Sequence, residues 1–284
     1  MLYVLYTAIA VAFLWAISSV TVRKLSELFG NVRSAVVILV GYAVVLMIIL
    51  PTSGYPGLTV NSFWESATAG LFIGVGYILV LKSLETESAG STFVFTELQV
   101  IIIAAFGVLI LGEHIAAASY IGMALIAAGL VFVSKKDGSR FNLNLMPAVI
   151  GNIFWAAGWV ALYYPIHAMD SYVFPVTIDY SFAALVALLY LAVNRKKILR
   201  RRSKNITRYF VLFVIIAVIA GALGNLIFGS IETSNYIAIG SAIANTSPII
   251  ITMIAYIAYK EKLTKMQILG LFVAVSGAVI INVL

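Results

Sequence analysis

The sequence lacks cysteine and is poor in charged residues and histidine. Without cysteine, it can form no disulfides, thiol-based active sites or cysteine metal centres. Charged residues make up 10% of its 284 residues, against about 25% in an ordinary soluble domain. The two histidines, His114 and His167, belong to no metal-binding pattern, and the phosphate loop that an ATP-driven pump needs is missing. We therefore expect no cofactor and no metal.

Long apolar runs take up most of the chain, which is 63% hydrophobic. A run of about 20 apolar residues is enough to cross a bilayer as a helix. The runs are apolar on both faces, without the period-two alternation of a barrel strand, so the backbone is expected to be helical. The sequence thus predicts an all-α membrane protein with ten transmembrane helices, at residues 2–22, 33–50, 64–82, 90–111, 116–134, 146–165, 172–193, 208–230, 236–259 and 265–283.

The basic residues predict the orientation of these spans. All 18 Lys and Arg residues lie in or beside the links that follow the first, third, fifth, seventh and ninth spans. Basic links stay on the cytoplasmic side, which places both termini outside a cytoplasmic membrane. This distribution also accounts for the net charge of +7 without nucleic-acid binding. The dense stretch from Arg195 to Arg208 is either a plain cytoplasmic stop signal or a site for anionic lipid head groups.

The chain contains an internal repeat. A shift of 148 residues superposes four pairs, and a shift of 140 superposes Trp15 on Trp155. Five spans per copy reverse the orientation of the second copy, which predicts two inverted five-helix repeats, residues 1–140 and 141–284. The alternative is chance recurrence of glycine in apolar helices. The four pairs are Gly76 with Gly224, Glu113 with Glu261, Gly122 with Gly270, and Gly129 with Gly277.

These repeated residues resemble a known family. In each half an acidic residue is followed nine residues later by a glycine, and a second glycine comes seven residues after the first. Together with the Trp15 region, this pattern resembles the EamA-like branch of the drug/metabolite transporter superfamily. The resemblance implies ten spans in two inverted repeats, with spans 1, 3, 4, 6, 8 and 9 lining a central cavity and spans 5 and 10 peripheral. Members of the family transport amino acids and other metabolites.

Ionisable and amide side chains inside spans are the first candidates for a binding site, because such groups are costly in lipid. Glu97 is the leading candidate, either as a functional carboxylate that binds a substrate ammonium or a proton, or as a structural one. The repeat pairs Glu97 with Asn245 and Gln99 with Ser247, and we expect these two polar clusters to face each other. Asp179 is a second candidate, although its place near the outer end of span 7 would also let it reach the interface.

Aromatic and amide residues complete the predicted substrate site. Trp15, Trp155 and Tyr77 are expected either to line the cavity or to act as aromatic anchors. Asn152 and Asn225 either contact the substrate or join helices by hydrogen bonds.

Pro248 is expected to bend span 9, as a gating hinge or as a static kink. Its repeat equivalent in span 4 is Val100, so the two helices are not expected to bend alike.

The predicted function is a secondary transporter of a small polar or amphipathic metabolite. Export of amino acids or related compounds by alternating access around a midplane cavity is the leading reading, with proton coupling as an option. Efflux of lipophilic cations and import of a metabolite are the alternatives. A membrane-embedded enzyme is a remote one, because paired aspartates and an activated nucleophile are lacking.

Overall fold

The computed structural model describes residues 2–54, 57–110, 112, 116–136, 140–195, 209–234, 237–260 and 263–283. The chain is almost entirely helical, which confirms the predicted all-α class, apart from a two-residue antiparallel pairing of β1 (Lys135–Lys136) with β2 (Arg140–Phe141). The long helices are α1 (Leu2–Phe29), α2 (Asn31–Ile49), α3 (Val60–Ser83), α6 (Ala117–Ser134), α7 (Met146–Met169), α8 (Val173–Val193), α10 (Tyr209–Glu232) and α13 (Lys265–Val283). The shorter ones are η1 (Leu50–Ser53), α4 (Ala89–Phe93), η2 (Val94–Thr96), α5 (Glu97–Leu109), η3 (Leu143–Leu145), α11 (Ile237–Ala244) and α12 (Ser247–Tyr259).

Within the described residues, 7 helical segments are long and apolar enough to cross a membrane. Three shorter apolar helices, Tyr120–Val133, Ser247–Tyr259 and Lys265–Gly277, coincide with the predicted spans 5, 9 and 10. The first span is longer than expected, since α1 continues past Val22 to Phe29. The extra turns carry the charged residues Arg23, Lys24 and Glu27, whose mutual contacts keep the helix going.

Spans 4 and 9 are each interrupted by a turn. Span 4 is divided into α4 and α5 by the 3₁₀ turn η2, and span 9 into α11 and α12 by a turn at Asn245 and Thr246. At each break a threonine hydroxyl bonds a backbone carbonyl three residues earlier, Thr96 to Phe93 and Thr246 to Ile243, both at 2.7 Å. Local hydroxyl bonds of this kind offer the backbone an alternative to the continuous helix.

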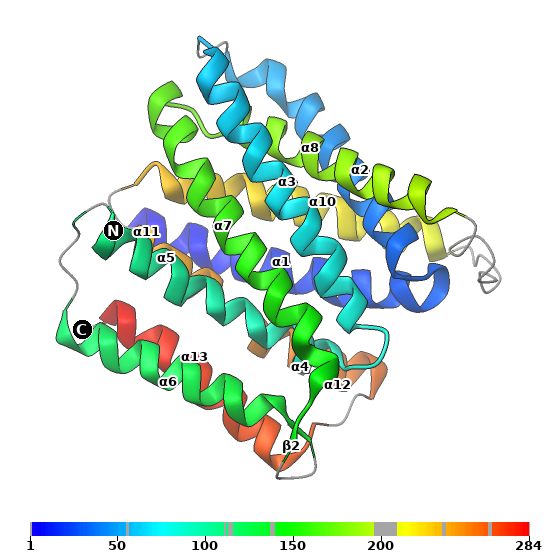
Figure 1. The fold of residues 1–284 in the computed structure, drawn as a ribbon, viewed down its shortest axis with the longest axis vertical. Coiled ribbons are helices and arrows are strands. Elements are labelled where there is room, and N and C mark those ends of the chain that lie inside the picture. Colours follow the sequence, from blue (N-terminus) through cyan, green and yellow to red (C-terminus); the bar gives the residue numbers. More distant parts are fainter. Residues whose placement is uncertain are drawn as a thin grey trace.

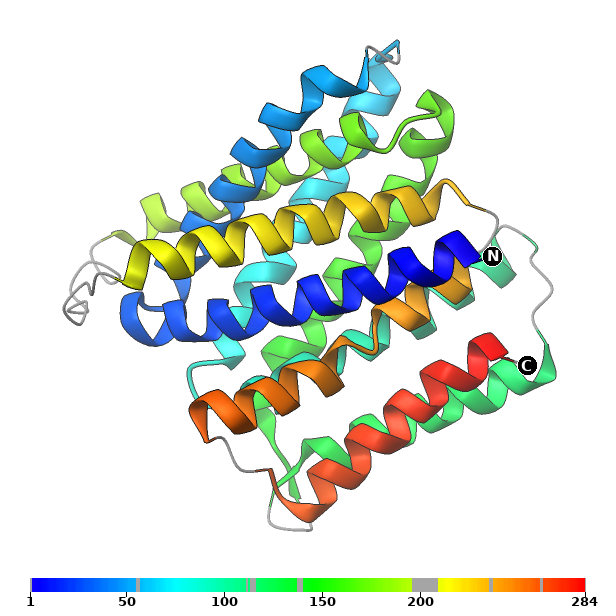
Figure 2. The ribbon, with the colours of Figure 1, turned by 180° about the vertical axis from the view of Figure 1, so that it is seen from behind.

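The helices form one bundle with a peripheral pair, α6 and α13, at its edge (Figures 1 and 2). Within the bundle α1 packs on α10, α3 packs on α7 and α8, and α2 packs on α8. The pair α6 and α13 lies along the edge, chiefly in contact with each other. The bundle has two ends: a basic end, where α1 and α12 finish and α2 begins, and an opposite end, where α1 and α8 begin and α10 finishes (Figure 2).

Glycines allow the closest helix contacts. A side-chain carbon at Gly129 of α6 would overlap the backbone of Gly270 and Ala274 in α13, and one at Gly277 would overlap the backbone of Gly122. This approach of small residues supplies dense packing in lipid, where the hydrophobic effect does not drive helix association.

Candidate functional site

A cavity lies inside the bundle between α1, α3, α7 and α10. Its volume is about 70 Å³, well below the range of about 300–1,000 Å³ usual for small-molecule sites, so the cavity is narrow in this structure. The part of its lining that the structure describes contains no Asp, Glu, Lys or Arg. The lining residues are Trp15, Ser18, Ser19, Val22, Tyr42, Ile73, Tyr77, Leu81, Phe93, Thr96, Gln99, Trp155, Trp159, Tyr180, Asn225, Ser247 and Ile251.

The two repeat-related tryptophans both line this cavity. Trp15 of α1 donates its indole N–H to Oδ1 of Asn225 on α10, at 2.8 Å. Trp155 of α7 donates to the backbone carbonyl of Ile73 on α3, at 3.2 Å, and its ring centroid is 5.7 Å from that of Tyr77. Both indoles are therefore held in place by helices of the opposite half of the chain.

Each indole also rests on a glycine. A side-chain carbon at Gly224 would overlap the Trp15 ring, and one at Gly76 would overlap the Trp155 ring. These two glycines are equivalent in the repeat, which accounts for the similar position of the two rings.

A chain of hydroxyl groups crosses the cavity wall. Ser18 donates to the backbone carbonyl of Ala217, at 2.9 Å. Because a serine hydroxyl has one proton, Tyr42, whose oxygen is 2.8 Å from Ser18 Oγ, must be the donor to Ser18. Tyr77 in turn forms a hydrogen bond with Tyr42. A carbon at Gly221 would collide with the Tyr42 ring, so glycine there makes room for the chain.

The predicted polar clusters of spans 4 and 9 are only partly assembled. Gln99 lines the cavity and its amide donates to Oδ1 of Asn152, at 3.2 Å, while Ser247 lines the cavity from the start of α12. Asn245 is buried but turns its amide to the backbone carbonyl of Ser241, at 2.8 Å, and is not among the lining residues. The predicted pairing of Asn245 with Glu97 stays a prediction. The side chain of Glu97 lies outside the described residues, as do Glu113 and Glu261.

Span 9 is interrupted beside Pro248, as expected. Pro248 occupies the first turn of α12, where its missing N–H is one that a helix leaves unpaired anyway. α11 ends at Ala244, four residues earlier, where the proline ring would clash with a continuing helix. The equivalent break in span 4 forms without a proline and contains a 3₁₀ turn.

Two lining tyrosines, Tyr42 and Tyr180, were missed because the family pattern assigns spans 2 and 7 no part in the cavity. Their rings pack edge to face, with centroids 5.5 Å apart, and both hydroxyls are buried. The signal in the sequence was a tyrosine in the middle of each of these two spans.

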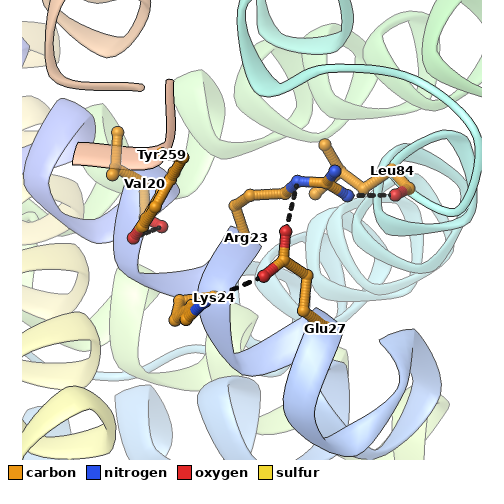
Figure 3. A network of polar contacts seen from close by, with 6 residues as sticks. All are labelled: Val20, Arg23, Lys24, Glu27, Leu84 and Tyr259. Atoms are coloured by element: carbon orange, nitrogen blue, oxygen red, sulfur yellow. Dashed lines mark hydrogen bonds and ion pairs between the residues drawn. The ribbon is translucent and has the colours of Figure 1, made fainter. Parts of the chain in front are cut away.

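A polar network lies at the basic end of the bundle (Figure 3). Its members are Val20, Arg23, Lys24, Glu27, Leu84 and Tyr259. Tyr259, at the end of α12, donates to the backbone carbonyl of Val20, at 2.9 Å. Arg23 donates to the carbonyl of Leu84 after α3, and its Nε lies 3.6 Å from Glu27. The network thus ties the end of α1 to α12 and to the α3–α4 link.

Asp179 lies inside the protein and not at the interface, which was one of its two expected positions. It is fully buried in α8, and neither carboxyl oxygen has a hydrogen-bond partner among the described residues. Glu232, the last residue of α10, is also buried, and its Oε2 has no partner there either. An isolated charge inside a membrane costs about 3 kcal/mol or more. Buried carboxyl groups without a hydrogen-bond partner are therefore rare in membrane spans. Glu232 was missed because the predicted span 8 ends at residue 230.

Comparison with known proteins identifies the family. The EamA-like transporter family model matches residues 2–135 and again 144–283. A protein of Clostridium kluyveri named as an uncharacterized transporter is 27% identical over 139 residues, which cover 48% of this chain and 44% of that protein. The chain therefore aligns with less than half of that relative's length.

A chain from a crystal structure has the same fold, with a TM-score of 0.70 at 16% identity, covering 98% of this chain and 95% of its own. Together with the seven apolar helical segments, the double match of the family model makes this a multi-pass membrane protein. The chain belongs to the EamA-like transporter family.

Proposed function

We propose that the chain is a secondary transporter that exports amino acids or related small amphipathic metabolites by alternating access. The observation that carries this proposal is the single cavity into which both halves of the chain send matching groups. Trp15 and Asn225 contribute from one side and Trp155 and Tyr77 from the other. Such a site, shared by two similar halves, is what a rocking mechanism needs.

The lining favours a solute with an apolar or aromatic part and a few polar groups. Its rings offer flat apolar surfaces, and Ser18, Gln99 and Asn225 offer hydrogen-bonding groups of both kinds. The helices α5 and α12 also begin at the cavity, where Gln99 and Ser247 line it. The partial positive charge at a helix start suits a carboxylate. A zwitterion with an apolar side chain meets all these conditions.

The ten-span, two-repeat architecture is part of the proposal. We assign residues 1–140 and 141–284 to two inverted repeats in the cytoplasmic membrane, with the basic end inside and both termini outside. The two matches of the family model support the division. Two matching glycine contacts between α6 and α13 also support it: Gly129 packs against Gly270, and Gly122 packs against Gly277. The two breaks in spans 4 and 9, with Pro248 beside the second, are the proposed gating points.

Efflux of lipophilic cations is the second candidate. It is favoured by the six Trp and Tyr rings of the lining, which can attract a cation through their faces. Glu97 would supply the counter-charge in that case. Replacing Glu97 with Gln should abolish cation transport or proton-coupled transport, whereas transport of a neutral or zwitterionic solute without coupling should largely survive.

Exchange of labelled solute across liposomes tests the proposal. Proteoliposomes preloaded with single amino acids are compared with others preloaded with sugars, nucleotides or quaternary amines, each with and without a pH gradient. We expect accelerated exchange with at least one amino acid, and loss of that exchange in the variant Tyr77→Ala. Exchange with quaternary amines alone would favour the second candidate, and exchange with none of these classes would contradict both. Anionic lipids, proposed to bind between Arg195 and Arg208, are varied in a separate series.

A further inference from the structure

The opposite end of the bundle holds two carboxyl groups that have been withdrawn from solvent. Asp179 is 0% exposed and Glu232 is 3% exposed. They come from α8 and α10, helices that approach closely enough for a carbon at Gly229 to crowd Val176 and Tyr172. Neither Asp179 oxygen, nor Oε2 of Glu232, has a hydrogen-bond partner in the described part of the chain.

No cation neutralises this pair within the described residues. The ion pairs found there link Arg23 and Lys24 to Glu27, at the other end of the bundle. Asp179 and Glu232 lie on helices that pack against each other, so their charges would repel if both were ionised. A buried carboxyl without a counter-charge is stable in its neutral form, and two that repel each other are more so.

The other titratable groups near Asp179 are phenols. Tyr180 follows it on α8, Tyr42 faces α8 from α2, and Tyr77 lies on α3. The acidic and histidine side chains of the neighbouring helices, Glu65 on α3 and His167 and Asp170 at the end of α7, are exposed. The basic residues of those helices, Arg33 on α2 and Lys82 on α3, lie in their terminal turns at the basic end.

The pair is connected to the transport cavity. Tyr180 lines the cavity, and its hydroxyl lies close enough to the Asp179 carboxyl for the two groups to interact electrostatically. The same tyrosine packs on Tyr42, which holds the hydroxyl chain to Ser18. A change of charge at Asp179 would therefore change the electrostatic environment of Tyr180, which lines the cavity.

We propose that Asp179 and Glu232 form a proton-binding site that controls the opening of this end of the bundle. With both carboxyls protonated, α8 and α10 stay packed against each other, as in this structure. When protons leave, two buried like charges remain on these two helices, and the helices separate until water reaches the charges. The inference rests on the proposed function for its link to transport, and on burial and geometry for the site itself.

The sign of the pH effect follows directly. The closed form binds more protons than the open form, so low pH favours closure and high pH favours opening. A proton gradient across the membrane can then bias the direction in which the transporter turns over.

Infrared spectroscopy tests the site without any substrate. The purified protein in lipid nanodiscs, at neutral pH, should show the carbonyl band of protonated carboxyl groups. The band should weaken in Asp179→Asn and in Glu232→Gln, and it should be unchanged in the control Glu65→Gln. Both variants resemble the protonated side chains, so they should stay folded. A spectrum without this band, or a band that neither variant weakens, would overturn the proposal.

Alkylation of a single cysteine tests the opening, because the chain has none of its own. Ile231→Cys places a thiol at a fully buried position beside Glu232, and Ser53→Cys provides an exposed reference that corrects for thiol ionisation. The ratio of the two alkylation rates by a water-soluble maleimide should rise between about pH 6 and about pH 8, by up to about tenfold per pH unit for each proton released on opening. It should stay flat when Asp179→Asn and Glu232→Gln are present.

A flat ratio in the protein with both carboxyls, or a rise that persists in the double variant, would refute the proposal. Neither measurement uses a transported solute. A wrong assignment of the metabolite would therefore leave this inference standing, and the failure of either measurement would leave the proposed metabolite open to its own test.

Discussion

The indole nitrogen of Trp15 lies 2.8 Å from Oδ1 of Asn225, a residue 210 positions away in the other half of the chain. The bond closes the cavity wall between α1 and α10. Both residues could be singled out from the sequence, yet their contact could not, because it depends on how the two helices are rotated about their axes.

This bond should show as a coupling between the two residues. Trp15→Phe and Asn225→Ala should each lower the free energy of unfolding, and the double variant should lose about 1 kcal/mol less than the sum of the two. The measurement is reversible unfolding in mixed micelles. Trp64→Phe, at a residue that is 59% exposed, is the control and should change stability by less than about 0.5 kcal/mol. Strictly additive losses would contradict the bond.

The Tyr42 hydroxyl should stabilise the fold, because it is hydrogen-bonded to both Ser18 and Tyr77. Tyr42→Phe leaves Tyr77 without its acceptor and Ser18 without its donor. We expect a loss of about 1–3 kcal/mol, the usual cost of buried polar groups that lose their partners. Tyr190→Phe is the matched control, since Tyr190 is 40% exposed on α8. Equal unfolding midpoints for the two variants would show that the hydrogen-bonded hydroxyls of Ser18, Tyr42 and Tyr77 do not stabilise the fold.

The contact of α6 with α13 should not tolerate a larger residue. Gly129→Val places a branched side chain against the backbone of Gly270, so the two helices must move apart. We expect the thermal unfolding midpoint to fall by several degrees, corresponding to about 2 kcal/mol or more. Ala127→Val, at an exposed position two residues earlier, should have little effect. A similar shift for both would show that the contact is not tight.

The proposed orientation can be tested by cysteine labelling in intact cells. Ser53→Cys, in the link after the second span, should react with a membrane-impermeant maleimide. Asn194→Cys, in the basic link after the seventh span, should react only after the cells are lysed. The reverse pattern would turn the transporter over and exchange the inner and outer ends of the cavity.

The sequence predicted the parts of the fold that depend on composition and missed those that depend on local competition for hydrogen bonds. Apolar runs and basic links define the spans, because each is a property of a whole segment. The breaks at Thr96 and Thr246 each span only a few residues, and a hydropathy pattern does not register them. Pro248 was the one local signal, and it lies beside the break in span 9.

Most cavity residues singled out from the sequence do line the cavity. Trp15, Trp155, Tyr77, Gln99, Ser247 and Asn225 all line it, and Asn152 supports Gln99 from behind. Asn245 donates its amide to the backbone carbonyl of Ser241, and its predicted pairing with Glu97 stays a prediction. Tyr42 and Tyr180 were missed because whether an aromatic residue faces lipid or protein depends on packing that composition does not specify.

Tryptophan fluorescence tests binding in this cavity most directly. Three of the four tryptophans, Trp15, Trp155 and Trp159, line it, and Trp64→Phe removes the fourth, which is exposed. In that variant, a solute that exchanges across liposomes should change the emission in a saturable way, and Tyr77→Ala should abolish the change. A transported solute that leaves the emission unaltered at saturating concentration would show that it binds elsewhere, and would contradict the cavity as the transport site.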